Sequence, residues 1–238
     1  MCGWKIPDTS FTGLGHWTGP CRPEWLVLLL IANAAGNLCS GTLSPNDTDF
    51  LENLHTQNAL DSPFCNATGV QCSLSPDNCT LQLLSVALAA TFFSGTIPAS
   101  LSTLPFLQEF SSDRNQISGS IPDLPTSLQV FSFNQNRLVG EIPIPVSNSS
   151  GSLRIFEAQN NQLTGTLPSF SYMPLLEKIK LSANTGMAGT LPSFSFCPNL
   201  QEFHAQTTKF SGSLPSFSNN GRHVFFFSVF TLKVRLYA

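Results

Sequence analysis

Histidine is the side chain that enzymes use most often for proton transfer, and the chain contains four histidines. Three of them, His55, His204 and His223, lie beyond an apolar segment near the N-terminus. None of the three has an acidic or nucleophilic residue at a spacing that would bring the two together. The serine-rich run at 147–152 has the composition of a loop, and no phosphate-binding glycine loop is present. We therefore predict no catalytic site and expect that the protein is not an enzyme.

Seven cysteines are the next candidates for chemistry. Metal binding is disfavoured because no C-x-x-C pair and no nearby histidine pair accompanies them, so we predict no metal and no cofactor. Cys65, Cys72 and Cys79 lie close together in the sequence, which indicates an oxidising compartment if the chain is exported. A pairing of Cys39 with Cys79 remains open.

An export signal is predicted at the N-terminus. The apolar run from Trp25 to Ala35 has eleven residues, follows a weakly positive segment and ends in the A-x-A sequence Ala32-Asn33-Ala34. It is much shorter than the ~20 residues that cross a bilayer. We expect cleavage between Ala34 and Gly36, while a buried helix or a short anchor is the alternative.

The composition limits the possible partners. Charged residues make up 11% of the chain and the net charge is −3, with no basic block, so nucleic acid is not expected as a partner. Asparagine in the N-x-S/T sequence that accepts sugars occurs at Asn46, Asn66, Asn78 and Asn148. Hydroxyls, amides and sugars would then keep this weakly charged surface in water.

One repeating unit accounts for most of the chain. The stretch from Leu153 to Pro168 reads L-x-x-L-x-L-x-x-N-x-L-x-G-x-L-P, with Phe156 and Ala158 at two of the leucine positions, and this is the leucine-rich repeat pattern. Its G-x-[IL]-P end recurs six times, at spacings of 24, 21, 25, 24 and 23 residues. These ends begin at Gly95, Gly119, Gly140, Gly165, Gly189 and Gly212.

Each unit is predicted to form one short strand, a turn, and an irregular or 3₁₀ convex segment. A single unit cannot bury its apolar side alone, so neighbouring units must stack to make a core. The asparagine position is expected to bond the open backbone groups of adjacent turns. It holds Asn115, Asn136, Asn161 and Asn184, with Thr91 and Thr208 in the outer units. Cys197 takes the position of Met173 in the preceding unit, which favours a buried free thiol.

The G-x-[IL]-P ending resembles the plant-type subclass of leucine-rich repeats, over roughly residues 49–215. The chain is thus similar to the ectodomains of plant receptor-like proteins and receptor kinases, and to the surface-antigen repeats of kinetoplastids. The resemblance implies an α/β solenoid, a curved right-handed superhelix whose short parallel strands line the concave face.

A cysteine-containing cap should precede the repeats. Helical spacing of Phe50, Leu51 and Leu54 within Asn46–Leu60 predicts a helix with Asp47 or Thr48 as its N-cap. The residues from Cys65 to Cys72 resemble the signature that ends the cap of plant-type repeats, although its usual tryptophan is missing. That resemblance implies a Cys65–Cys72 disulfide worth about 2–3 kcal/mol.

The C-terminal end is expected to carry a seventh strand. Val224 and Phe227 lie 24 residues after Leu200 and Phe203, which predicts a strand over Val224–Phe230 in that frame. The last eight residues alternate apolar and polar, as in a half-buried strand. An uncapped phenylalanine-rich edge strand is an aggregation hazard. We therefore expect a piece of a longer surface protein, with a genuine short secreted form as the alternative.

Strand residues that point away from the core would form the site. We expect them to make a concave, amide-rich surface of mixed charge that hydrogen-bonds a protein, peptide or glycan. The predicted contact residues are Glu109, Asp113, Arg114, Asn134, Arg154, Glu157, Gln159, Glu177, Lys178, Lys180, Glu202 and His204, with Ile155 beside them.

Four segments follow from these arguments. They are a signal peptide (1–35), an N-terminal cap (36–80), six repeats (81–218) and a partial seventh repeat or atypical end (219–238). The predicted function is recognition at the cell surface or in secreted form. Two alternatives stay open: the ectodomain of a receptor kinase whose catalytic part and membrane anchor lie elsewhere, and a structural coat or adhesion protein.

Overall fold

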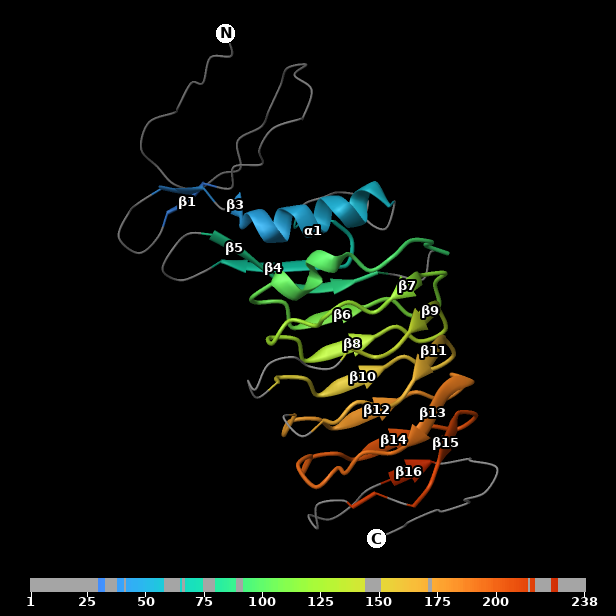
Figure 1. The fold of residues 1–238 in the computed structure, drawn as a ribbon. Helices are drawn as coiled ribbons and strands as arrows, with labels where there is room; N and C mark the ends of the chain where they lie inside the picture. The colour runs from blue at the N-terminus through green and yellow to red at the C-terminus, as the bar shows by residue number, and fades with distance from the viewer. Residues whose placement is uncertain are drawn as a thin grey trace, which may run out of the picture.

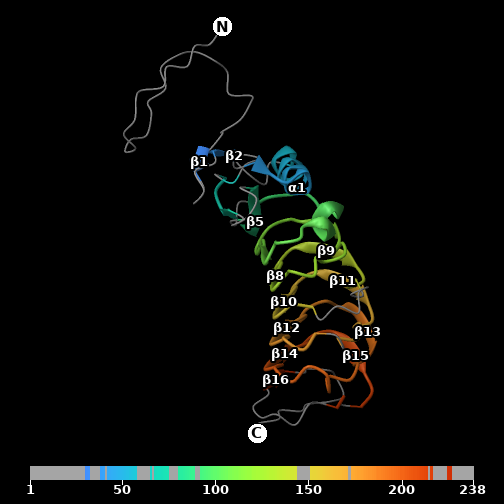
Figure 2. The same ribbon diagram turned by 90° about the vertical axis from the view of Figure 1, so that its left-hand side faces the viewer.

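The computed structural model describes residues 30–32, 38–40, 42–57, 65, 67–74, 80–88, 92–143, 151–170, 173–213, 215–216 and 224–226. Stacked repeats form a solenoid in which two columns of parallel strands run along opposite sides (Figure 1). Figure 2 shows this stack from the side, with the column that includes β8 to β16 along one edge and β9 to β15 along the other. The predicted solenoid fold is confirmed.

The first column is a nine-stranded sheet with the order β16-β14-β12-β10-β8-β6-β5-β3, and β4 pairs antiparallel with β5. Its strands are β3 (Thr42–Leu43), β4 (Val70–Leu74), β5 (Thr80–Ala87), β6 (Glu109–Ser111), β8 (Val130–Ser132), β10 (Ile155–Glu157), β12 (Lys178–Lys180), β14 (Glu202–His204) and β16 (Val224–Phe226). We call the solvent side of β6, β8, β10, β12 and β14 the concave face.

The second column is a five-stranded sheet with the order β15-β13-β11-β9-β7. Its strands are β7 (Ser118–Ser120), β9 (Arg137–Gly140), β11 (Gln162–Gly165), β13 (Gly186–Thr190) and β15 (Lys209–Ser211). The sequence predicted irregular or 3₁₀ structure after each turn, and this sheet corrects that prediction. A 3₁₀ helix, η1 (Ala99–Thr103), follows the first G-x-[IL]-P end.

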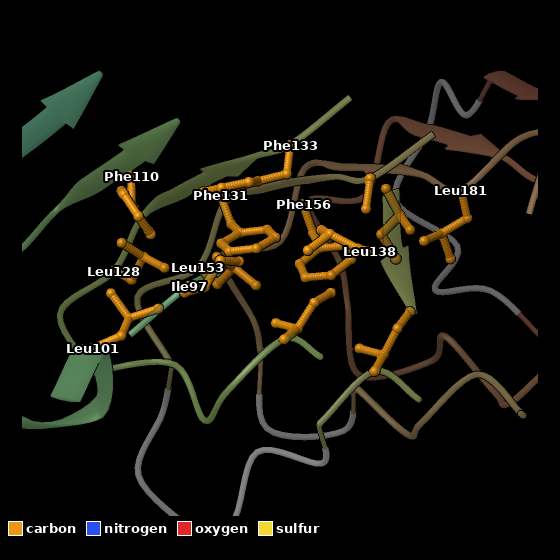
Figure 3. Close-up of a cluster of buried hydrophobic side chains, with 14 of the residues drawn as sticks. Ile97, Leu101, Phe110, Leu128, Phe131, Phe133, Leu138, Leu153, Phe156 and Leu181 are labelled. Carbon is orange, nitrogen blue, oxygen red and sulfur yellow. The ribbon is translucent and has the colours of Figure 1, made fainter. Parts of the chain in front are cut away.

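The hydrophobic core fills the space between the two columns. Side chains from successive strands stack along the solenoid axis, as Figure 3 shows for Phe110, Phe131 and Phe156. The Phe131 and Phe156 rings stack with centroids 5.2 Å apart. Phe110 meets Phe133 edge-on at 4.8 Å. Because each ring packs on those of neighbouring repeats, no repeat could bury its apolar side in isolation.

The predicted asparagine ladder is confirmed. The Asn136 side chain accepts a hydrogen bond from the Ile117 N–H and donates to the Ser112 carbonyl. Asn184 likewise accepts from the Leu163 N–H and donates to the Ala158 carbonyl. Each amide therefore reaches into the preceding repeat and satisfies buried backbone groups there. In the last ladder position, the Thr208 hydroxyl donates to the Ala205 carbonyl.

The cap covers the N-terminal end of the solenoid. Helix α1 (Pro45–Thr56) buries Phe50, Leu51 and Leu54, and the Phe50 ring contacts Phe110 with centroids 5.5 Å apart. The predicted N-cap is wrong: Ser44 caps the helix, and its hydroxyl accepts from the Asp47 N–H because Pro45 at the first position has no N–H to give. Leu60 lies outside the described residues.

The cap disulfide is present between Cys65 and Cys72. Cys197 is a buried free thiol, as predicted. The pairing of Cys39 with Cys79 stays a prediction because the Cys79 position lies outside the described residues. Of the four sugar-acceptor sites, Asn46 lies exposed in the first turn of α1, whereas Asn66, Asn78 and Asn148 lie outside the described residues.

The register of the seventh strand differs from the prediction. Residues Val224–Phe226 form β16, but Phe203 pairs with Phe225 rather than with Phe227. Val224 therefore lies opposite Glu202, at a position that faces away from the core. The repeats vary in length because their loops do, and a repeat of fixed length could not locate this strand.

At the N-terminal side, β1 (Leu30–Ala32) and β2 (Leu38–Ser40) pair antiparallel. This pair leaves the cleavage of a signal peptide a prediction. Among the described residues, no helix has the length and hydropathy of a membrane span.

Candidate ligand-binding face

The concave face is built from two rows of side chains. In each three-residue strand the middle residue is buried, as for Phe110, Phe156 and Ile179, so the first and third residues face solvent. Parallel pairing aligns the first residues in one row: Glu109, Val130, Ile155, Lys178 and Glu202. The third residues form the second row: Ser111, Ser132, Glu157, Lys180 and His204.

A hydrogen-bonded group joins β6, β8 and β10 beside the second row. One carboxylate oxygen of Asp113 accepts from the Ser132 hydroxyl at 2.9 Å and from the Asn134 backbone N–H at 2.7 Å. The Asn134 amide in turn donates to Glu157 at 2.9 Å and accepts from the Gln159 backbone N–H at 3.1 Å. These bonds fix the side chains without help from a ligand.

Ion pairs continue the connection across β10, β12 and β14. Lys180 Nζ lies 3.0 Å from a Glu157 oxygen and 3.8 Å from Glu202, and Lys178 Nζ lies 3.2 Å from Glu202. At the edge of the face, Arg154 contacts Glu177 at 2.7 Å. The two lysine side chains are about one-quarter exposed, so the pairs are partly shielded from water. Positive and negative groups therefore alternate and neutralise each other here.

The ionisation of Glu157 reflects this arrangement. Burial opposes its charge, but the hydrogen bond from Asn134 and the ammonium of Lys180 outweigh burial, so the pKa of Glu157 is lowered. Glu157 therefore carries a full negative charge at neutral pH and holds Lys180 in place.

His204 shows the opposite balance. Burial and the nearby Lys180 disfavour its protonated form, and although Glu202 and Glu157 favour that form, the pKa of His204 is lowered. His204 is therefore neutral at pH 7. A neutral imidazole presents one donor and one acceptor to a partner.

The structure brings most of the predicted contact residues together, but it gives them different surroundings. Asp113, Asn134, Glu157, Lys180, Lys178 and Glu202 form the connected group, and Asn134 is buried within it. Arg114 is exposed at φ 59° in the turn after β6. Within the described residues, neither Arg114 nor Glu109 forms an ion pair. Gln159 contributes its backbone N–H.

Sequence reasoning missed Val130. It lies in register with Ile155 on the adjacent strand, and both side chains are half-buried on the concave face. The signal was present, because Val130 directly precedes the core residue Phe131 as Ile155 precedes Phe156. The face is therefore not uniformly polar: an apolar pair occupies its centre.

Comparisons with known proteins agree with this architecture. No protein-family model matches the chain. The Arabidopsis thaliana leucine-rich repeat receptor-like protein kinase PXC2 is 35% identical over 109 residues, which are 44% of this chain and only 11% of that relative. Among solved structures, the ectodomain of the Arabidopsis thaliana receptor kinase SOBIR1 matches 71% of this chain and 98% of its own, with a TM-score of 0.61 and 23% identity.

The BIR2 ectodomain from Arabidopsis thaliana gives a similar result. It matches 72% of this chain and 97% of its own, with a TM-score of 0.56 and 25% identity. The repeat register, the two sheets and the cap disulfide described above account for these matches. The chain is therefore a plant-type leucine-rich repeat solenoid with the fold of plant receptor-kinase ectodomains.

Proposed function

We propose that the protein is a non-enzymatic recognition module that works outside the cell and binds a protein, peptide or glycan on its concave face. The observation that carries the proposal is the connected group of Asp113, Asn134, Glu157, Lys180 and Glu202, which spans five adjacent strands. Side chains that are already fixed lose little entropy when a partner binds, and this favours specific recognition.

Two further solved structures support the fold as a scaffold for partners. The ectodomain of GASSHO1/SCHENGEN3 was solved in complex with CASPARIAN STRIP INTEGRITY FACTOR 2, and BIR3 in complex with SERK2. Their TM-scores to this chain are 0.56 and 0.53, at 24% identity. At this identity the likeness concerns the fold, so it supports partner binding in general and leaves the partner to be found.

A second candidate is the ectodomain of a receptor kinase, which the match to PXC2 favours. In that case the concave face keeps the same role, and the kinase and membrane anchor lie in other parts of a longer protein. A structural coat or adhesion protein is the third candidate. It differs from the first two in requiring no specific contact on the concave face.

A pair of charge-neutral variants tests the proposal. The first combines Glu109→Gln, Arg154→Gln, Lys178→Gln and Glu202→Gln, which removes two charges of each sign from the concave face. The matched control combines Arg137→Gln and Glu141→Gln, two exposed residues of opposite charge that belong to the opposite side of the solenoid, in and just after β9.

Both variants of the full chain are screened against a peptide-display library and a glycan array. We expect ligands of the wild-type protein to bind the concave variant about tenfold more weakly and the control equally well. Equal binding to both variants would remove the proposed function and favour the structural alternative.

Localisation is tested by expressing the chain with its own N-terminus in a secreting eukaryotic cell. We expect protein in the medium that begins near Ala35 and loses mass on enzymatic deglycosylation. Protein that stays in the cell with Met1 and no sugar would contradict the extracellular part of the proposal.

A further inference from the structure

The charges of the concave face divide into a closed part and an open part. On β10, β12 and β14 every lysine or arginine has a carboxylate within 3.2 Å: Arg154 has Glu177, Lys180 has Glu157 and Lys178 has Glu202. A charged ligand would have to break one of these pairs before it could bind there, and a broken pair costs more than an unmade one. This part of the face therefore holds the strands in register rather than offering charge to a partner.

The open part lies on β6 and β8. Glu109 is half-exposed, and its carboxylate accepts only a long hydrogen bond of 3.4 Å from the Ser111 hydroxyl. Within the described residues it has no basic partner. Val130 is its register partner on β8, and Ile155 follows on β10. An unneutralised carboxylate thus stands beside a pair of half-buried aliphatic side chains.

We infer that the occupant of this part of the face is an extended peptide that carries a basic residue and, two positions away, an apolar residue. The inference rests on the proposed function and specifies its partner. The basic side chain contacts Glu109, and the apolar side chain covers the Val130–Ile155 pair.

Spacing supports the two-residue separation. Adjacent strands lie about 4.8 Å apart, so the centre of the Val130–Ile155 pair is about 7 Å from Glu109 across the sheet. In an extended peptide, side chains on the same side recur every two residues, over about 6.7 Å. A peptide that crosses the strands therefore places residues i and i+2 on the two features, and residue i+1 points to solvent.

Charge complementarity selects a peptide over a glycan. Sugar chains are neutral or acidic, so they offer no cation to Glu109, and their hydroxyls would lose hydrogen bonds over Val130 and Ile155. Lysine or arginine supplies the cation, and an aliphatic or aromatic side chain removes the exposed apolar surface from water.

The experiment selects randomised nine-residue peptides, displayed on phage, on the full chain. We expect enrichment of basic-x-apolar sequences over basic-apolar sequences, whose two side chains point to opposite sides of an extended peptide. Synthetic peptides from the selection are then measured against four single variants. Glu109→Gln is matched by Glu141→Gln, and Val130→Thr is matched by Val139→Thr, an exposed valine of β9.

Affinity should fall about threefold in Glu109→Gln, as for an exposed ion pair, and the dependence on salt should disappear with it. It should fall about fivefold in Val130→Thr, which replaces a methyl contact by a hydroxyl. The Glu141 and Val139 controls should bind as the wild-type protein does.

Two outcomes overturn the inference, and they bear differently on the proposed function. Enrichment of acidic peptides whose binding requires Lys178 or Lys180 would show that the ion-paired part is the site, and the concave-face proposal would survive. Failure to enrich any peptide would exclude a peptide occupant, and glycan binding to the concave face would then decide the proposed function separately.

Discussion

The side-chain oxygen of Asn161 accepts a hydrogen bond of 2.9 Å from the backbone N–H of Leu138, which belongs to the preceding repeat. The same amide donates to the carbonyl of Phe133 at 2.8 Å and to that of Ala158 at 3.0 Å. One buried side chain therefore satisfies three backbone groups that neither sheet pairs. It joins two repeats at the point where the chain turns from one sheet to the other.

Asn161→Ala is expected to lower the free energy of unfolding by about 2–4 kcal/mol, because the Leu138 N–H and two carbonyls lose their partner in a buried site. Urea unfolding followed by circular dichroism measures the change. Gln162→Ala, at an exposed position of β11, is the control and should change stability little. A similar loss in both variants would mean that the ladder does not stabilise the stack.

The ladder was predictable from sequence because a polar residue recurs at one position of a fixed repeat. The repeat also predicted the core residues and the solvent-facing row. The second sheet was not predictable in this way, because strands such as β9 and β11 have four residues and end in glycine. The Ser44 N-cap could have been found from the Ser-Pro pair that begins α1.

The Cys65–Cys72 disulfide closes a short loop, since the two residues are 7 apart in sequence. Cys65→Ser with Cys72→Ser should cost about 2.5 kcal/mol, because the unfolded chain regains the freedom of that loop. Thermal unfolding of the wild-type protein with and without dithiothreitol provides the comparison. If the double variant responds to dithiothreitol as strongly as the wild-type protein, the effect belongs to another cysteine pair.

Two glycines in the left-handed region allow backbone strain to be separated from close contact. Gly69 and Gly140 have φ values of 84° and 80°, but a Cβ added at Gly69 would lie 2.1 Å from the Ala87 carbonyl oxygen. At Gly140 the nearest atom would be the Ser120 Cβ at 3.7 Å. Gly140→Ala should therefore cost about 1 kcal/mol, for φ alone.

Gly69→Ala should cost considerably more. The Ala87 oxygen can move only with the backbone of β5, and the Ala87 N–H bonds the Gly69 carbonyl at 2.8 Å. Urea midpoints of the two variants, compared with the wild-type protein, measure the difference. Equal midpoints would show that the β4–β5 region adjusts freely.

Cys197 is expected to resist alkylation in the folded protein. Burial raises the pKa of its thiol to about 11, so almost no thiolate is present at pH 8, and the side chain is shielded from reagent. Peptide mapping by mass spectrometry after iodoacetamide treatment distinguishes it from the other cysteines. Labelling should become complete in 6 M guanidinium chloride, whereas labelling at equal rates in the two conditions would contradict the buried position.

The contact residues were predicted as a surface, but their pairing was not. Whether Lys180 bonds Glu157, 23 residues earlier, depends on strand register and on side-chain rotamers, and a sequence specifies only the first of these. The contrast between ion-paired Lys178 and unpaired Glu109 has the same origin. Composition showed a balance of charge on the face and could not show where that balance fails.

Protonation of His204 should destabilise the protein on mild acidification. The pKa of His204 lies below its ordinary value of 6.5, because burial and Lys180 disfavour the charged form more than Glu202 and Glu157 favour it. The unfolded chain then binds the proton more readily than the folded chain does. Stability is therefore constant above the ordinary pKa and declines as the pH falls from that value toward the lower folded one.

Unfolding free energies measured from urea titrations between pH 7 and about pH 5 test this, since few other side chains titrate in that range. Glu157 has a lowered pKa as well, but its contribution is lost only below the ordinary carboxyl range and does not interfere. His204→Gln should flatten the decline, whereas His55→Gln, which changes a histidine in the last turn of α1, should preserve it. A decline that is identical in both variants would mean that acid acts on the cap or on another group, and that His204 is protonated in the folded chain as easily as in the unfolded one.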